Sequence, residues 1–151
     1  MRISDLGEFG LIDMLARIAP QGGPEHRVLI GIGDDAAAWQ CEGPAVLATV
    51  NGAGIPNVIY VGEIHYVPGV GFIVADNYFC KTRANIQQGS KGAILFLTAD
   101  RKSFQVKGPL TYHTSGPVFE HMRALHDPRR PGVGATRLPI EEIYSGAEKL
   151  L

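Results

Sequence analysis

A lysine and a threonine, Lys81 and Thr82, stand where a short apolar strand at 72–75 gives way to a predicted helix. The N-terminus of a helix presents unpaired backbone N–H groups and the positive end of the helix dipole. An ammonium and a hydroxyl at this point therefore predict a seat for a phosphate group. The local sequence also fits a solvated Lys81 and a Thr82 that only caps the helix.

The loop between that strand and the helix carries polar and aromatic side chains. Asn77 could hydrogen-bond a flat heteroaromatic ligand, and Tyr78 or Phe79 could pack against it. Turn chemistry alone would also explain an Asp76-Asn77 pair. The loop is thus a second candidate for ligand contact, beside the phosphate seat.

Two more groups of polar residues could act on a ligand. Gln105 and Lys107 share one face of a predicted strand, which is also the pattern of a two-faced surface strand. Asp34 and Asp35 follow a glycine-rich run, and adjacent carboxylates could hold Mg²⁺ beside nucleotide phosphates. Two acidic residues in such a turn are commonplace, so the sequence predicts no metal site and these aspartates form the weaker alternative. No nucleophile arrangement is visible.

Composition restricts the class of protein. The 151 residues carry 14 Lys and Arg against 15 Asp and Glu, and 45% are hydrophobic. This balance is typical of an ordinary globular domain and gives no support for binding nucleic acid or an acidic membrane surface. No apolar run approaches the ~20 residues of a membrane span, and the first residues do not resemble a signal peptide. We expect a cytoplasmic protein with free thiols at Cys41 and Cys80.

Strand-like runs dominate the chain from residue 44 onward. Residues 45–50 and 57–61 flank Asn51-Gly52, a pair that tolerates positive φ and predicts a hairpin turn. Further strands are expected at 71–75, 93–98 and 104–113, and helices at 82–88 and 117–126. The pattern is mainly β and predicts a small antiparallel barrel or sandwich.

The N-terminal residues have a different pattern, and we divide the chain into an extension at 1–43 and a domain at 44–151. Residues 8–19 have the spacing of an amphipathic helix, and residues 27–39 hold a strand interrupted by glycine and aspartate. The expected extension is therefore a helix followed by a strand.

From about residue 45 to the C-terminus, the chain resembles the FMN-binding split-barrel family related to pyridoxamine 5'-phosphate oxidase. The resemblance is carried by residues 47–50 with 54–57, by 75–77 through 81–85, and by 105–108 followed by 113–120. It implies a six-stranded antiparallel split β-barrel with short flanking helices. It also implies a homodimer that holds one FMN per subunit at the dimer interface.

The resemblance implies roles for individual residues. Lys81 and Thr82 would take the FMN phosphate. The flavin would be lined by Ile59, Tyr60 and Val61 from the second strand, bordered by Ala75, Asp76 and Asn77, and approached by Gln105 from a neighbouring strand. Arginine-rich substrate-phosphate determinants, which we associate with true pyridoxamine phosphate oxidases, are not evident. An FMN-dependent oxidoreductase or electron carrier with an unknown substrate or redox partner therefore fits better, and its catalytic residues are unassigned.

The N-terminal segment, about 1–40, resembles the start of thiamine-monophosphate kinase. Residues 6–13 look like that family's opening helix, and residues 31–37 look like its Mg²⁺–nucleotide motif. Asn51 stands near the place of that family's next metal aspartate, and an amide cannot supply the charge. We expect a fused segment without kinase chemistry.

Two alternatives stay open. One is a Mg²⁺–nucleotide-binding or regulatory module that uses Asp34 and Asp35, with the barrel as a dimer scaffold. The other is a barrel that binds a different flat cofactor, deazaflavin or haem, because a fold does not fix its ligand.

Overall fold

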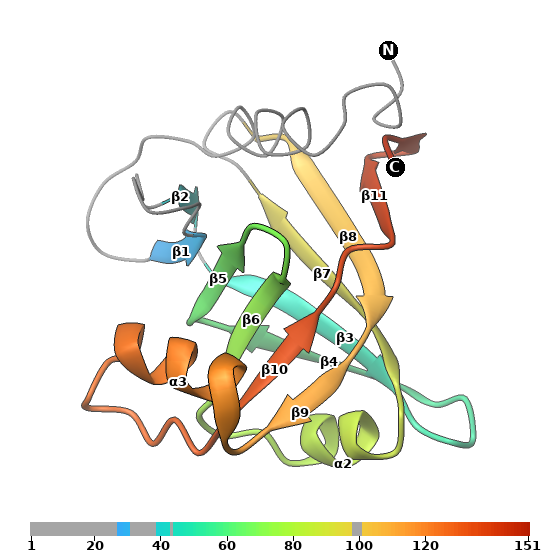
Figure 1. The fold of residues 1–151 in the computed structure, drawn as a ribbon. Helices are drawn as coiled ribbons and strands as arrows, with labels where there is room; N and C mark the ends of the chain where they lie inside the picture. Colours follow the sequence, from blue (N-terminus) through green and yellow to red (C-terminus); the bar gives the residue numbers. More distant parts are fainter. Residues whose placement is uncertain (1–26, 31–38, 43, 98–100) are drawn as a thin grey trace.

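The structure is a computed structural model that describes residues 27–30, 39–42, 44–97 and 101–151. Its described strands form three antiparallel sheets (Figure 1). The smallest pairs β1 (Arg27–Ile30) with β2 (Trp39–Glu42). The other two have the strand orders β5-β6-β10-β9 and β12-β11-β8-β7-β3-β4. No helix among the described residues is long and apolar enough to span a membrane.

The two larger sheets and two helices make up the split barrel, so the predicted fold class is confirmed. The six-stranded sheet contains β3 (Ala45–Val50), β4 (Pro56–Val61), β7 (Lys91–Leu97), β8 (Ser103–Pro109), β11 (Glu142–Ser145) and β12 (Glu148–Lys149). The four-stranded sheet contains β5 (Ile64–Val67), β6 (Gly71–Asp76), β9 (Thr111–His113) and β10 (Gly134–Leu138). The helices are α2 (Lys81–Gln87) and α3 (Gly116–Leu125).

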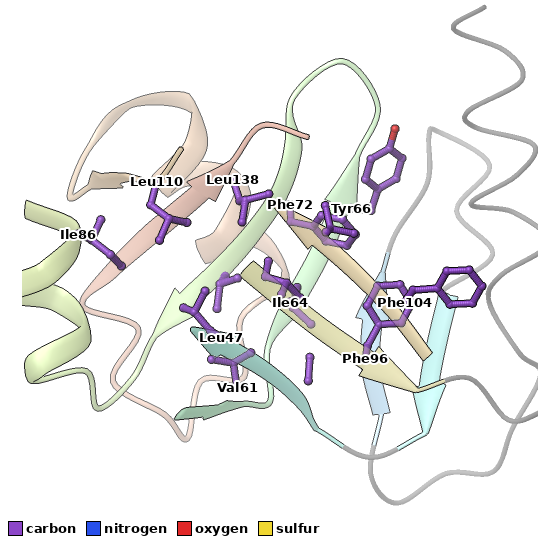
Figure 2. Packing of buried hydrophobic residues seen from close by; sticks show 14 of the residues in the cluster. Leu47, Val61, Ile64, Tyr66, Phe72, Ile86, Phe96, Phe104, Leu110 and Leu138 are labelled. Carbon is purple, nitrogen blue, oxygen red and sulfur yellow. The ribbon is translucent and has the colours of Figure 1, made fainter. Parts of the chain in front are cut away.

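The main core lies between the two sheets. Alternate residues of β3 and β8 are buried, which is the period-two pattern of strands with one face toward a core. The aromatic rings of Tyr66, Phe72, Phe96 and Phe104 form a continuous row, with successive centroids 5.5, 6.3 and 5.8 Å apart (Figure 2). Ile86 of α2 reaches the same cluster, so α2 is anchored to the barrel by its own apolar side.

A second, smaller cluster lies under α3. Met122 of α3 packs with Ile73 and Ala75 of β6 and with Ala135 of β10. All six residues of β6 are buried, because one face of this strand meets the main core and the other meets α3. The helix expected at 117–126 therefore packs on the barrel, and Pro117 lies in its first turn as its fixed φ favours.

The structure contains four strands that the sequence analysis did not predict, β5, β10, β11 and β12, and it differs from the predicted elements at two further places. The strand expected at 104–113 is divided at Leu110 into β8 and β9, which belong to different sheets. The predicted hairpin forms, but its positive φ is at Gly54 rather than at Gly52. Asn51 instead holds the turn with its side chain, because its Oδ1 accepts the backbone N–H groups of Ala53 and Ile55, each at 2.9 Å.

Several expectations for the N-terminal part lie outside the described residues. They include the helix at 8–19, the Asp34 and Asp35 pair, and the segments that resemble thiamine-monophosphate kinase. The division at residue 43 stays a prediction.

Candidate functional site

The candidate site is built around β4, which is the edge strand of the six-stranded sheet. Two side-chain hydrogen bonds join this strand, and Glu63 two residues beyond its end, to the segment that follows β6. Asn57 Nδ2 donates to Thr82 Oγ1 at 2.9 Å, and Asn77 Nδ2 donates to Glu63 Oε2 at 3.4 Å. The edge of β4 and residues 77–82 are therefore joined near both ends of the strand. We call this region the split.

Lys81 and Thr82 begin α2 at one end of the split, as the sequence predicts. Lys81 is exposed, but Thr82 is only 1% exposed and its hydroxyl accepts the Asn57 amide. The helix is fixed in place, since Asn85 Nδ2 donates to Thr49 Oγ1 on β3 at 3.0 Å. Lys81 therefore places an exposed positive charge at the start of α2, at this end of the split.

Asp76 occupies the interior behind the split. Its carboxylate accepts the Phe79 backbone N–H at 2.9 Å, Arg83 Nε at 2.6 Å and the Tyr112 hydroxyl at 2.6 Å. The hydrogen bond from Arg83 to Asp76 raises the pKa of Arg83 above its usual value. Burial, and then the bond to Asp76, raises the pKa of Tyr112. The buried carboxylate thus positions the loop, α2 and β9.

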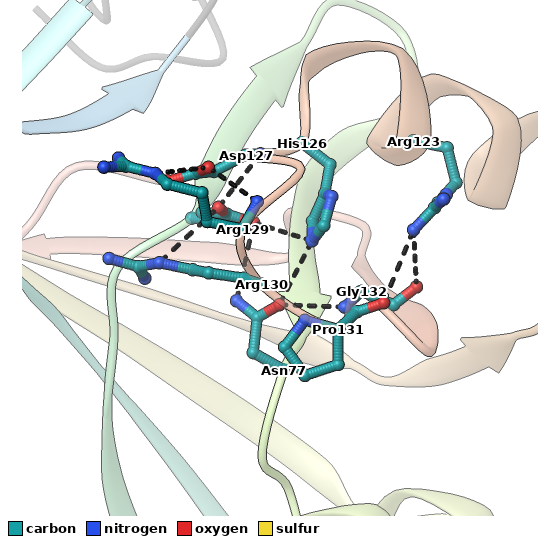
Figure 3. A network of polar contacts seen from close by, with 9 residues as sticks. Asn77, Arg123, His126, Asp127, Arg129, Arg130, Pro131 and Gly132 are labelled. Carbon is teal, nitrogen blue, oxygen red and sulfur yellow. Dashed lines mark hydrogen bonds and ion pairs between the residues drawn. The ribbon is translucent and has the colours of Figure 1, made fainter.

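Asn77 lies at the other end of the split, within a network of polar contacts (Figure 3). Its Oδ1 accepts the Gly132 backbone N–H at 3.0 Å and lies 3.3 Å from Nε2 of His126. Glu63 joins the network, because its Oε1 accepts the Asp127 backbone N–H at 3.2 Å. The side chain of Asn77 therefore connects the split to the loop between α3 and β10.

The other predicted residues lie on different surfaces. Ile59 packs on the main core and Val61 is buried there, whereas Tyr60 points outward and is 76% exposed. Ala75 is buried in the cluster beneath α3. Gln105 lies on the outward face of β8, in register with Leu95 of β7. Contact of each of these residues with a ligand stays a prediction.

Within one chain, Gln105 does not lie beside the split. The pairing runs from Tyr60 through Val46 and Leu95 to Gln105, so Gln105 is three strands from Tyr60. At the usual strand spacing, that separation is about 14 Å across the outer face of the sheet. A ligand in the split of the same chain would therefore lie away from Gln105.

The outer face of the six-stranded sheet is rich in exposed apolar groups. Five large apolar side chains on β3, β4 and β7 are exposed: Val50, Val58, Tyr60, Leu95 and Leu97. Beside them is a hollow of about 380 Å³, lined in part by Ala48, Ala93, Gly92 and Gly108, with Lys107 and Glu142 at its side. This face combines apolar cover with a depression, which is typical of a surface that meets another protein.

Sequence reasoning missed four residues of the site: Asn57, Glu63, His126 and Arg130, whose Nε lies 4.0 Å from Oε1 of Glu63. Their contacts join positions far apart in the chain, such as Glu63 with Asp127 and Asn57 with Thr82. No spacing rule links such pairs, so no local signal could have found them. Within the described ranges, there is no group of three side chains suited to a metal ion.

Proteins of known structure share this fold. The HupZ protein of Group A Streptococcus is 24% identical, with a TM-score of 0.62 over 71% of this chain and 87% of that one. An FMN-binding protein of Syntrophomonas wolfei is 17% identical, with a TM-score of 0.55 over 70% and 78% of the two chains. The heme storage protein HutZ of Vibrio cholerae is 16% identical, with a TM-score of 0.53 over 67% and 84%.

Sequence comparison points to one family. The protein MJ0282 of Methanocaldococcus jannaschii, itself uncharacterized, is 29% identical over 104 residues, which are 66% of this chain and 70% of that protein. Residues 34–145 match the family model described as pyridoxamine 5'-phosphate oxidase. The chain therefore belongs to the pyridoxamine 5'-phosphate oxidase family.

Proposed function

We propose that this protein binds FMN in the split and acts in the cytoplasm as a flavin-dependent oxidoreductase or electron carrier. The observation that carries the proposal is the exposed Lys81 at one end of the edge strand β4, in a chain that belongs to this family. Family membership supports flavin binding in general, and the arrangement of this chain's own groups favours a phosphorylated, flat cofactor.

The residues of the split fit FMN chemically. Lys81 would hold the phosphate by a charge-assisted hydrogen bond, and backbone groups at the edge of β4 would hydrogen-bond the polar rim of the ring system. Ile59, which is half-buried beside that edge, would give the ring apolar contact. When bound, FMN supplies the hydride or electron transfer. The protein's part is to bind and orient the cofactor, and the buried Asp76 keeps the loop at 77–79 in one conformation for this purpose.

The proposal includes a homodimer. The outward side chains of Val58 and Tyr60 are 62% and 76% exposed, and burying them against a second copy would remove apolar surface from water. The same packing would also allow Gln105 of one copy to approach the split of the other.

The test is the affinity for FMN of wild type and of Lys81→Ala. Removing a charge-assisted hydrogen bond of ~1.5–3 kcal/mol should weaken FMN binding about tenfold to a hundredfold. Lys149→Ala is the matched control, because Lys149 is an exposed lysine that pairs with Glu142 at 3.5 Å, away from the split. Gel filtration of the FMN-loaded protein, followed by visible absorbance, should show flavin that co-elutes at the mass of a dimer.

The outcomes separate the parts of the proposal. An unchanged FMN affinity in Lys81→Ala would contradict the phosphate assignment, and flavin that elutes with a monomer would contradict the dimer. Since the fold is shared with a heme storage protein, the same titration with hemin and with a deazaflavin distinguishes the cofactors. Tighter binding of either would replace FMN in the proposal.

A further inference from the structure

A second hollow lies where the turn between β5 and β6 meets the end of β10. Its volume is about 220 Å³, and its lining includes Tyr66, Gly69, Gly71 and Arg137. Figure 1 shows this turn at the end of β6 that lies away from α2. At the usual rise of a strand, Gly71 and Asp76 at the two ends of β6 are about 17 Å apart. This hollow, which we call the β5–β6 hollow, is therefore separate from the split.

The turn on one side of the β5–β6 hollow has a defined backbone conformation. The Val70 N–H donates to the Val67 carbonyl at 3.0 Å, and Gly69 and Gly71 have φ values of 74° and 106°, which favour glycine. A Cβ on Gly71 would clash with the carbonyl oxygen of Leu138, so glycine lets the start of β6 lie against the end of β10. The backbone wall of the hollow is thus set by the fold itself.

Arg137 is the one charged side chain among the described residues that line the β5–β6 hollow. Its Nε donates to the carbonyl of Val70 at 2.8 Å, which holds the guanidinium at the turn. This bond uses a single N–H and leaves both terminal NH₂ groups without a hydrogen-bond partner in the part of the chain that the structure describes. The guanidinium therefore has a fixed place and open donors.

Arg137 also lacks a counter-ion, although it is only half-exposed. Arg83 and Arg129 each form an ion pair with an aspartate, whereas Arg137 has no acidic partner among the described residues. A charge that is partly removed from water loses hydration, and that loss is offset only when an opposite charge or hydrogen bonds replace the water. An anion in the hollow would supply both.

The remaining walls of the β5–β6 hollow are largely apolar. They include Tyr66, Val70, Pro139 and Ile140. Tyr66 belongs to the aromatic row of the main core and Ile140 packs against that core, so these walls are part of the folded barrel (Figure 2). Sites for drug-sized ligands have volumes of about 300–1,000 Å³, so a hollow of about 220 Å³ suits a smaller molecule.

We propose that the β5–β6 hollow binds a small carboxylate with an apolar body. The planar fork of the Arg137 guanidinium matches the two oxygens of a carboxylate, and the apolar walls would contact the body. The inference goes beyond the proposed function, because it needs neither FMN in the split nor a second copy of the chain. Arg137 is then a ligand-binding residue as well as a link between the turn and β10.

The experiment uses nitrogen–proton correlation NMR of the protein as purified, with benzoate, acetate and benzamide as probes. The signals to follow are the amides of Gly69 and Gly71 and the Nε–H of Arg137, because they report on the hollow alone. Benzoate should shift them along a saturable curve. Benzamide should bind at least about tenfold more weakly, since it lacks the charge that strengthens the hydrogen bonds. Acetate should also bind more weakly than benzoate, because it has no ring to place against the apolar walls.

Variants test whether Arg137 carries the preference. Arg137→Met should abolish the preference for benzoate over benzamide, and Arg137→Lys should keep part of it, because lysine retains the charge without the fork. Arg123→Met is the matched control, since Arg123 also donates to backbone carbonyls but does not line the hollow. It should bind benzoate as wild type does. If Arg137→Met does not fold, Arg137→Lys and the comparison of probes on wild type decide.

Several results would overturn the proposal. Equal binding of benzoate and benzamide by wild type, no saturable shift at the β5–β6 hollow, or a preference that survives in Arg137→Met would each exclude the carboxylate site. Acetate that binds as tightly as benzoate would contradict the apolar body. Because the signals belong to the hollow, a protein that holds no FMN gives the same answer, so failure of the proposed function would not be mistaken for failure of this site.

Discussion

Replacing aspartate by asparagine should have different effects on stability in two aspartate–arginine pairs of this protein. The reason is that one carboxylate is buried and the other is partly exposed. Asp76 and Arg83 are 2.6 Å apart, with side chains 0% and 35% exposed. Asp127 and Arg129 are 2.9 Å apart, with side chains 25% and 88% exposed. Asp76→Asn should lower the free energy of unfolding substantially, and Asp127→Asn should not change it measurably.

The expected size of the Asp76→Asn effect follows from the partners of the carboxylate. Asparagine has the same shape, but its NH₂ group puts a donor either at the Oδ2 position, opposite the Arg83 donor, or at the Oδ1 position, opposite the Phe79 backbone N–H. Each hydrogen bond to a charged group contributes about 1.5–3 kcal/mol. Because about a third of the Arg83 side chain is in water, its share must be reduced for solvent screening. We expect a loss of about 2–4 kcal/mol, a large part of the ~5–15 kcal/mol that stabilises a typical domain.

The assay is urea unfolding followed by circular dichroism, with wild type, Asp76→Asn and Asp127→Asn measured side by side. Equal m-values would show that the three proteins expose similar surface on unfolding, so their midpoints can be compared. An Asp76→Asn protein as stable as wild type would refute the structural role of this carboxylate. A destabilised Asp127→Asn protein would refute the assignment of the difference to burial.

Two further predictions concern β9 and the β3–β4 hairpin. Because the pKa of Tyr112 is raised in the folded protein, its contribution to stability is full below the ordinary tyrosine pKa of about 10 and is lost as pH rises through the folded value. Tyr112→Phe should therefore be less stable than wild type by about 1–2 kcal/mol near neutral pH, but its stability should fall less than that of wild type in alkali. If the free energies of unfolding of the two proteins fall in parallel above about pH 10, this prediction is wrong. Asn51→Ala should lower the free energy of unfolding by about 1–2 kcal/mol, since Asn51 Oδ1 accepts two backbone N–H groups. Gly52→Ala should change this free energy little, because a Cβ at residue 52 meets nothing within 4 Å. A Gly52→Ala protein as unstable as Asn51→Ala, measured by the same unfolding assay, would show that the turn depends on Gly52.

Much of the fold could be predicted because several elements are specified locally. The runs that became β3, β4 and β6 are apolar and bounded by turn residues, and α2 and α3 begin and end close to where the sequence predicts. The division at Leu110 could not be predicted in this way. Leu110 is apolar and buried, so the run from β8 to β9 reads as one strand although its halves pair with different sheets.

The candidate site was less predictable, because its polar groups are used by distant partners. Local sequence marks Asp76 and Asn77 as loop residues, but Asp76 meets Tyr112 across 36 positions and Asn77 meets Gly132 across 55. Lys81 differs in this respect, since its place at the start of α2 follows from the adjacent residues alone. Sequence therefore predicted the position of the exposed cation but not the network that supports the loop beside it.

The edge strand β4 connects the proposed cofactor and the proposed dimer. One edge of this strand has no partner among the described strands, and its outward side chains Val58 and Tyr60 are largely exposed. A cofactor in the split would satisfy backbone groups at the edge but would leave the outward face in water. A second copy would cover that face and bring its own Gln105 toward the split, whereas Gln105 of the same chain is about 14 Å from Tyr60 across the sheet. The two proposals therefore account for different surfaces of one strand, and neither alone explains why both surfaces are left open in a single chain.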